Sequence, residues 1–486
     1  MKLASLYTSA FVVVFVYLYC YLIQHVRGAE IPEFRKFNVK PSFVFPNEES
    51  IGRVISGPPP LNAILSDVRL QPLEFRYHNY DELTQYLQEI NAQYPHITSF
   101  YSIGKSIQGR DLWVLMLSTE PNKKVVLKPN VKYVGGIHGN EPVGRELMLH
   151  LIQYLVVNYQ SDPYVRWLLD NTRVHILPAM NPDGFEVAKE GDCHGAQGRY
   201  NIRGYDLNRN FPDYFRQNTR QIQPEAEAIQ NWLKQTHFVV SGGLHGGALV
   251  ASYPFDNKPA QALEAFSSYS SSLTSDNDIF EHLATTFSFN HRTMHLGKAC
   301  RGDRKGFTNG TTNGAEWYYL TGGMQDFNYI WHGVLEVTFE LSCCKYPPAS
   351  QLESFWEDNK KALLQYLGEA HRGIRGIISD ENGQPIPKTS VKVSGRDVGM
   401  QTTPLGEYWR VLLPGNYLLE VYKEGFEPRE IPFAIQEGIP AVLNVTLRRD
   451  RSVGSPSAVQ KLSSIQPQEP HQSGNGFFNR FFSFFG

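Results

Sequence analysis

From about residue 80 onward, short apolar runs alternate with amphipathic stretches. The runs of strand length are residues 131–137, 173–178 and 238–244, and the stretches with helical spacing are residues 81–90, 146–157 and 225–233. Strands separated by helices are typical of a sheet that carries helices on its faces. The pattern therefore predicts an α/β domain, which we assign to residues 73–370. In such sheets, sites collect where strands end.

The pattern changes after His371. Short β-type runs follow one another, separated by the turn sequences at 380–383 and 414–416. Turns every 8 to 12 positions are typical of a small β-sandwich, so we predict an all-β domain over residues 371–449. The runs are residues 373–378, 391–395, 408–413 and 417–422.

The two ends of the chain differ from its middle. The apolar run at 11–23 is too short to span a bilayer comfortably, so residues 1–28 are predicted to be a cleaved signal peptide, with an uncleaved anchor as the alternative. Residues 29–72 contain several prolines and are predicted to be an extended leader. Residues 450–486 are predicted to be a disordered tail. The tail ends in a Phe-rich segment at 477–486, which leaves membrane association open.

The net charge of the chain limits the classes of binding partner that we expect. The formal net charge of the chain is -2, so no overall field favours nucleic acid or an anionic membrane. We expect no nucleic-acid partner and a monomeric protein, with any charge preference confined to a local site.

The cysteines indicate an oxidising compartment. Once Cys20 is removed with the signal peptide, Cys193, Cys300, Cys343 and Cys344 remain, an even number that predicts two disulfides in one of three pairings. A cysteine zinc site is the alternative, but adjacent Cys343 and Cys344 lack the usual spacing of such sites.

Two glycosylation sequons fit the same compartment. They begin at Asn309 and Asn444, and both match the Asn-x-Thr pattern. They are predicted as glycosylation sites of a secreted protein.

One local motif carries the chemistry. His138 and Glu141 stand three residues apart at a predicted strand-to-helix junction, where Gly139 eases a tight turn and Pro142 suits the first helical position. His245 follows another apolar strand much later in the chain. Two histidines and one glutamate with an open fourth position are what a catalytic zinc needs. The alternative is that both histidines merely cap strands.

These motifs and several others resemble the zinc metallocarboxypeptidases. The likeness is greatest to the regulatory subfamily that includes carboxypeptidases M, N, D and E, and within it to the M branch. It covers residues 75–449. It implies a mixed eight-stranded-type sheet flanked by helices, followed by a transthyretin-like β-sandwich. The motifs are His138-Gly-Asn-Glu141, Asn181-Pro-Asp-Gly-Phe185, Asp206-Leu-Asn208-Arg209, Leu244-His245-Gly-Gly and Thr338-Phe-Glu340-Leu-Ser-Cys343-Cys344-Lys345.

The resemblance implies that His138, Glu141 and His245 bind one zinc ion per chain. It also implies that Glu340, at the end of the apolar strand 335–339, is the general base. A carboxylate in that position can take a proton from water and pass it to the leaving amine.

An exopeptidase must also bind the free α-carboxylate of its substrate. By resemblance, Asn208 and Arg209 hold that carboxylate, and a planar guanidinium suits the task because it donates two parallel hydrogen bonds. Tyr318 matches the mobile tyrosine that closes over it, with neighbouring Tyr319 as a rival.

Three further roles are implied by the resemblance. Arg199 stabilises the oxyanion of the tetrahedral intermediate, with Arg203 as a nearby competitor. Asp256 lines the pocket for the departing side chain, with Gln325 close by, and a partly buried carboxylate there favours Lys or Arg.

The resemblance also selects one disulfide pairing, Cys193 with Cys344 and Cys300 with Cys343. Taken together, these features predict a secreted zinc carboxypeptidase acting on peptides and proteins that end in Lys or Arg. The alternatives are a catalytically inactive binding protein on the same scaffold and a zinc amidase for small acyl-amino acids or acidic tails.

Overall fold

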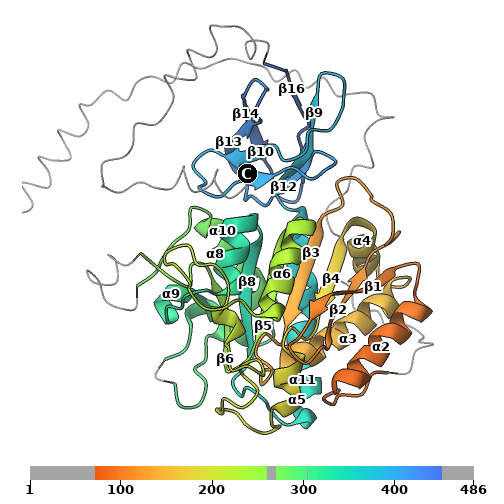
Figure 1. Cartoon of the computed structure of the whole chain (residues 1–486), viewed down its shortest axis with the longest axis vertical. Coiled ribbons are helices and arrows are strands. Elements are labelled where there is room, and N and C mark those ends of the chain that lie inside the picture. The colour runs from red at the N-terminus through yellow and green to blue at the C-terminus, as the bar shows by residue number, and fades with distance from the viewer. Residues whose placement is uncertain (1–71, 260–269, 304, 451–486) are drawn as a thin grey trace, which may run out of the picture. The chain divides into compact units, whose positions relative to one another are not determined.

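A computed structural model describes residues 72–259, 270–303 and 305–450 (Figure 1). The predicted signal peptide, the leader up to residue 71 and the tail from residue 451 lie outside the described residues. All described residues belong to the unit Ile55–Gly486, the second of two into which the chain divides. Among them, no helix is both long and apolar enough to cross a membrane.

The first domain is built on a mixed sheet of eight strands in the order β1-β2-β4-β3-β5-β8-β6-β7. Strands β4, β3, β5 and β8 run parallel in its centre, and antiparallel pairings flank them. The α/β fold expected from the sequence is therefore confirmed. The strands are β1 Thr98–Lys105, β2 Asp111–Leu117, β3 Asn130–Gly135, β4 Arg173–Leu177, β5 Phe238–His245, β6 Ala248–Tyr253, β7 Thr311–Asn313 and β8 Leu335–Ser342.

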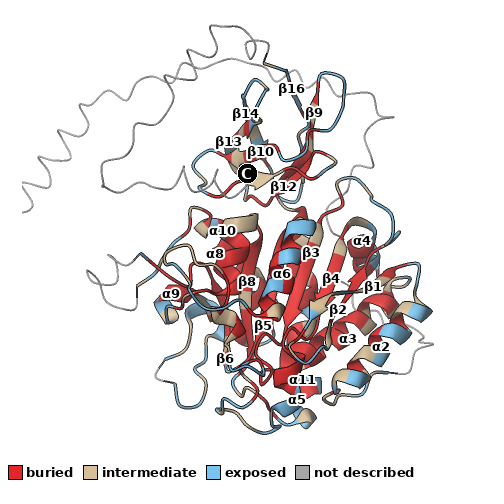
Figure 2. Cartoon of the chain, in the orientation of Figure 1, coloured by how far each residue is buried: buried red, intermediate tan, exposed pale blue. Residues whose placement is uncertain are grey.

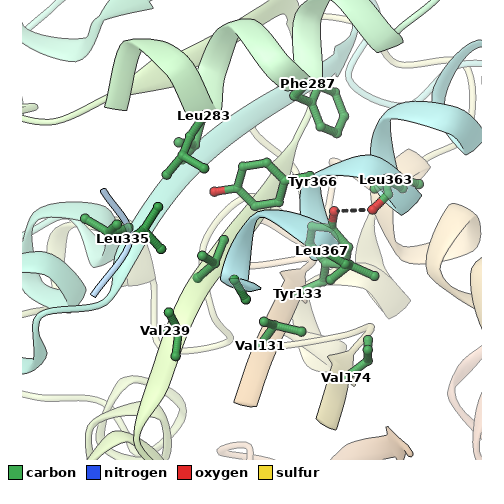
Figure 3. Packing of buried hydrophobic residues seen from close by; sticks show 14 of the residues in the cluster. Val131, Tyr133, Val174, Val239, Leu283, Phe287, Leu335, Leu363, Tyr366 and Leu367 are labelled. Carbon is green, nitrogen blue, oxygen red and sulfur yellow. Dashed lines mark hydrogen bonds between the residues drawn. The ribbon is translucent and has the colours of Figure 1, made fainter. Parts of the chain in front are cut away.

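Helices cover both faces of this sheet. Buried side chains of α2, α3, α4, α8 and α11 form one core with one face, while α6 and α10 pack on the other. In Figure 3, Tyr133 of β3 crosses the first core, and its hydroxyl donates to the Leu363 carbonyl of α11 at 2.8 Å. The helices are α2 Tyr80–Gln93, α3 Val143–Asn158, α4 Pro163–Asn171, α5 Pro182–Val187, α6 Pro224–Gln235, α8 Asn277–Asn290, α9 Gly314–Trp317, α10 Met324–His332 and α11 Leu352–Gly368.

The central strands are buried along most of their length (Figure 2), and every residue of β5 is buried. Parallel strands with helices on both faces have no solvent side, so their sequences become continuous apolar runs instead of alternating ones. This is why the runs at 131–137, 173–178 and 238–244 could be recognised as strands.

The second domain is all-β, as expected. One sheet has the order β11-β10-β13-β14, and the other has β12-β9-β15 with β16 also paired to β9. Buried Val391, Tyr408 and Leu419 contribute to the core of this domain. The strands are β9 Ile374–Asp380, β10 Ser390–Val393, β11 Met400–Gln401, β12 Glu407–Arg410, β13 Gly415–Tyr422, β14 Arg429–Ile435, β15 Ala441–Val442 and β16 Val445–Leu447.

Candidate metal centre and substrate cleft

Three neighbouring parallel strands carry the central side chains at their carboxyl ends. His138 follows β3, His245 is the last residue of β5, and Glu340 lies near the end of β8. Gly135 of β3 is in register with Leu244, and His245 is in register with Glu340. The sheet thus brings together residues that are far apart in the chain, at the edge where α/β proteins place their sites.

His138, Glu141 and His245 form a buried group suited to a metal ion. The Glu141 Oε2 atom lies 2.9 Å from His138 Nδ1 and 3.0 Å from His245 Nδ1, and each residue is 3% exposed. One ligand atom from each falls within 4.8 Å of the others. Two imidazole nitrogens and a carboxylate oxygen aimed at one point match the donor set of a catalytic zinc, so these residues fit that ion.

Charge inside this group follows from burial and proximity. Burial would raise the pKa of Glu141, but the charge and hydrogen bonds of His138 and His245 outweigh it, and the pKa of Glu141 falls well below its usual range. Burial lowers the pKa of His245, which favours the neutral imidazole that a metal requires.

Asp206 orients the group from outside, a role that the sequence analysis did not assign. Its Oδ1 atom lies 3.1 Å from His138 Nε2, and its Oδ2 atom accepts from Arg199 Nη2 at 3.0 Å. Burial opposes ionisation, but His138 and Arg199 outweigh it and lower the pKa of Asp206. Because a metal-binding histidine usually donates its other ring N–H to a carboxylate, Asp206 leaves Nδ1 of His138 for the ion.

The turn that holds the ligand pair depends on a close approach. A Cβ atom on Gly139 would lie 2.2 Å from the backbone nitrogen of Phe185, so no side chain fits there. The expected tight turn is present, since the Glu141 N–H donates to the His138 carbonyl oxygen at 3.1 Å, and the close approach to Phe185 is an additional reason for a glycine. Pro142, expected as the first helical residue, is instead the N-cap of α3, and the helix begins one residue later at Val143.

A cavity of about 220 Å³ opens beside the metal group. It collects most of the residues singled out in the sequence. Its lining consists of His138, Glu141, Arg199, Asn208, His245, Gly246, Gly247, Ser252, Asp256, Gly314, Trp317, Tyr318, Leu320, Thr338, Glu340 and Lys345.

Glu340 lies buried in the wall of the cavity, beside the metal group. It is 6% exposed, and its Oε2 atom has no hydrogen-bond partner within the described residues. Burial, then the charge of Glu141, raises the pKa of Glu340 well above its usual range, while Lys345 and Arg199 act in the opposite direction. In its ionised form, a buried carboxylate in a cavity wall can accept a proton from a bound water, and a raised pKa makes it the stronger base.

The residues expected to bind the terminal carboxylate of the substrate lie in or beside the cavity. Asn208 lines the cavity, and Arg209 beside it donates to the Asn208 carbonyl oxygen at 2.8 Å. Tyr318 lines the cavity and is 41% exposed, whereas neighbouring Tyr319 is 45% exposed and outside the cavity lining.

The two candidate arginines, Arg199 and Arg203, differ more clearly in their position relative to the cavity. Arg199 lines the cavity and donates through Nη1 to Glu141 Oε1 at 3.3 Å. Arg203 is exposed, and it lies outside that lining. Of the two, Arg199 is therefore the one within reach of the metal group.

Asp256 lies in the cavity wall with a defined set of contacts. Gln325 Nε2 donates to its Oδ1 atom at 3.0 Å, and the Asp326 carboxylate accepts from its backbone N–H at 3.0 Å. A Cβ on Gly314 would lie 1.9 Å from Asp256 Oδ1, so a glycine is needed for this wall to form. Burial raises the pKa of Asp256 to about 7, with Arg209 lowering it.

Disulfides fasten the turn after Glu340. The pairs are Cys193–Cys344 and Cys300–Cys343, the pairing that the resemblance implied. The next residue, Lys345, reaches Glu141 Oε1 at 2.5 Å. The sequence motif that contains Lys345 gave this lysine no role. Its distance from Glu141 shows that it pairs with that carboxylate.

Both sequons are accessible. Asn309 and Asn444 are exposed, and the Asn444 amide oxygen accepts from the Ile377 backbone at 2.9 Å. That contact occupies the oxygen and leaves the amide nitrogen, to which a glycan would attach. Their modification stays a prediction.

An α/β sheet whose strand ends carry a His₂Glu group that fits zinc, beside a buried carboxylate, is typical of zinc-dependent hydrolases. Two family models match the chain, "Zinc carboxypeptidase" over residues 83–362 and "Carboxypeptidase regulatory-like domain" over residues 373–448. The chain belongs to the zinc carboxypeptidase family, and it is a metallocarboxypeptidase with a C-terminal transthyretin-like domain.

Two curated relatives support membership in this family. The chain is 48% identical over 357 residues to carboxypeptidase M of Mus musculus, covering 73% of this chain and 80% of that protein. It is 39% identical over 413 residues to the carboxypeptidase N catalytic chain of Rattus norvegicus, covering 80% and 89%. The crystal structure of thrombin activatable fibrinolysis inhibitor matches with a TM-score of 0.47 and 21% identity over 60% of this chain and 74% of that one.

Proposed function

We propose that this protein is a secreted zinc carboxypeptidase that removes C-terminal lysine or arginine from peptides and proteins. The observation that carries the proposal is Asp256, a carboxylate 7% exposed in the wall of the same cavity as the metal group. A cationic side chain entering the cavity would pair with that charge, whereas an acidic one would be repelled. The likeness to carboxypeptidases M and N supports the same class of substrate.

The side-chain pocket is completed by neutral groups. Gln325 donates to Asp256 Oδ1 and accepts from the Thr338 backbone N–H at 2.8 Å, so its amide is fixed. Gly314 leaves Asp256 uncovered on the side where a Cβ would collide with it. Such a pocket would hold a lysine or arginine side chain without a second charge.

The terminal carboxylate of the substrate needs its own partners. Arg209, beside cavity-lining Asn208, would donate two hydrogen bonds to it, and the Asn208 amide would donate a third. Tyr318, in the cavity wall and 41% exposed, would cover the bound residue. These contacts would limit cleavage to the last residue of a peptide.

His138, Glu141 and His245 would hold one zinc ion per chain. When bound, zinc supplies a Lewis acid that acidifies water and polarises a carbonyl. Glu340 would take the proton of the attacking water on its Oε2 atom, which has no hydrogen-bond partner in the described part of the chain, and deliver it to the leaving amine. Arg199 would stabilise the negative charge that develops on the scissile carbonyl oxygen.

Compartment and assembly complete the proposal. Two disulfides and two exposed sequons suit an oxidising, extracellular location. We expect a monomer that binds peptide substrates and no nucleic acid, and the Phe-rich end leaves membrane association open.

Hydrolysis of blocked peptides ending in Arg, Phe or Glu, each with and without chelator, tests the proposal. We expect turnover of the Arg peptide, loss of that turnover on metal removal, and recovery with zinc. No turnover of any peptide would favour the inactive binding protein, and turnover of the Glu peptide alone would favour the zinc amidase.

A further inference from the structure

The β-domain and the catalytic domain share one buried carboxylate. Arg410, the last residue of β12, forms an ion pair with Asp276 Oδ2, and the two residues are 2% and 0% exposed. The same oxygen accepts a hydrogen bond from the Tyr329 hydroxyl at 2.7 Å. Asp276 precedes α8, and Tyr329 lies on α10, so one oxygen joins a cation of the β-domain to a helix of the catalytic domain.

The helix that Tyr329 anchors also carries the contacts to Asp256. One turn before Tyr329, Gln325 donates to the Asp256 side chain and Asp326 accepts from its backbone. The Tyr329 ring also packs against Phe255, the residue before Asp256, with ring centroids 5.8 Å apart. Tyr329 therefore touches both elements that determine where the Asp256 carboxylate lies.

The β-domain also approaches the far end of the same helix closely. Gly333, which ends α10, lies so close to the β-domain that a Cβ on it would stand 3.0 Å from the Gly399 carbonyl oxygen. The β-domain thus meets α10 at its last turn as well as through Arg410 and Asp276. Tyr329 and Gly333 lie toward the C-terminal end of α10, whereas Gln325 lies in its first turn.

The form of the ion pair indicates a positional role. Arg410 Nε and Nη1 have no hydrogen-bond partner within the described residues. A buried pair with unsatisfied donors recovers little of its desolvation cost, so it is weak support for stability. Its better-attested use is to fix how elements are placed.

We propose that the β-domain positions α10, and through it the pocket for the basic side chain, with Arg410 and Tyr329 as the positioning residues. This inference rests on the proposed preference for lysine and arginine. Charge recognition in a buried pocket depends steeply on geometry, so a small shift of Gln325 or Asp256 weakens substrate binding. The reaction centre at the strand ends is built by the sheet and would be affected less.

The test compares Tyr329→Phe, Arg410→Met and Arg410→Lys in the full-length chain. Tyr329→Phe removes only the hydroxyl that reaches Asp276, and Arg410→Lys keeps the charge. Arg372→Met is the matched control, because Arg372 links the domains through Glu369 at 2.9 Å and Glu437 at 2.8 Å instead. KM and kcat are measured on a blocked peptide ending in Arg, together with zinc content and thermal unfolding.

We expect Tyr329→Phe and Arg410→Met to raise KM about 5- to 10-fold with kcat changed less than about 2-fold, because the lost contact positions the pocket and not the reaction centre. Arg410→Lys should recover part of the loss, and Arg372→Met should leave KM unchanged. The double variant of Tyr329 and Arg410 should lose less than the product of the single losses, since both act through Asp276.

Two results would overturn the inference. One is an unchanged KM in folded, zinc-loaded Tyr329→Phe protein, which is the informative variant if Arg410→Met does not fold. The other is an equal KM increase in Arg372→Met, which would mean that any loosened domain contact has this effect. If the unaltered enzyme does not cleave the Arg peptide at all, the proposed function fails first and this inference falls with it.

Discussion

His245 and Glu340 are paired in register on the parallel strands β5 and β8. Their spacing is therefore fixed by the hydrogen bonds of the central sheet, where every residue of β5 is buried. A proposed metal ligand and the proposed base held on rigid strands keep their geometry without help from loops. This relationship makes the role of Glu340 testable apart from the integrity of the metal group.

Replacing Glu340 with glutamine should remove the base and leave the metal. The amide keeps the size of the side chain but cannot take a proton, so kcat should fall about 10²- to 10⁴-fold. Zinc content, measured in the same preparation by atomic absorption, should stay at the unaltered level. Near-normal rates with zinc bound would remove Glu340 from the mechanism.

Replacing Asp206 with asparagine should weaken metal binding. Asparagine preserves the shape of the side chain but loses the carboxylate that faces His138 Nε2 and Arg199, so zinc affinity should fall about 10- to 100-fold. Competition with a chromophoric chelator measures the dissociation constant. Asp213→Asn is the control, because that carboxylate binds Asn257 and the Gly322 backbone instead. Equal affinities in both variants would contradict the prediction.

Replacing Asp256 with alanine should change selectivity more than catalysis. The loss in kcat/KM should be about 100-fold for peptides ending in Arg or Lys and much smaller for those ending in Leu, since only the former pair with the carboxylate. Glu316→Gln serves as the control, because Glu316 is an exposed acid two residues from Tyr318. An equal loss for both classes of peptide would exclude Asp256 as the specificity residue.

Selectivity should also depend on pH. Burial raises the pKa of Asp256 to about 7, so its carboxyl group is neutral below that pH and charged above it. KM for an Arg peptide should therefore rise about tenfold between pH 8 and pH 6, while KM for a Leu peptide should stay nearly flat. Asp256→Asn should abolish the difference. A parallel change for both peptides would assign the titration to another group.

The sequence predicted those strands whose burial on both faces makes them continuously apolar. Strands β3, β4 and β5 were recognised because helices on both faces make them continuously apolar. Strand β1 was not, because most of its residues are only partly buried and its pattern is irregular. Strand β7, three residues long, is too short to give any periodic signal.

The residues of the candidate site also differ in how well the sequence alone could predict them. His138 and Glu141 were identified because their spacing is local and typical of a metal site. Asp206 and Lys345 were not assigned, because their partners are 68 and 204 residues away in the chain. Contacts over such separations depend on the order of strands in the sheet, which periodicity does not reveal.

The proposed metal ligands lie at or just beyond the ends of two strands, β3 and β5, that are adjacent only in the finished sheet. Glu141 and His245 are 104 residues apart, and no short fragment contains both. A nascent chain would therefore gain tight zinc binding only after β5 has docked beside β3. The time course of zinc binding during refolding should therefore report when the centre of the sheet assembles, before any substrate is added.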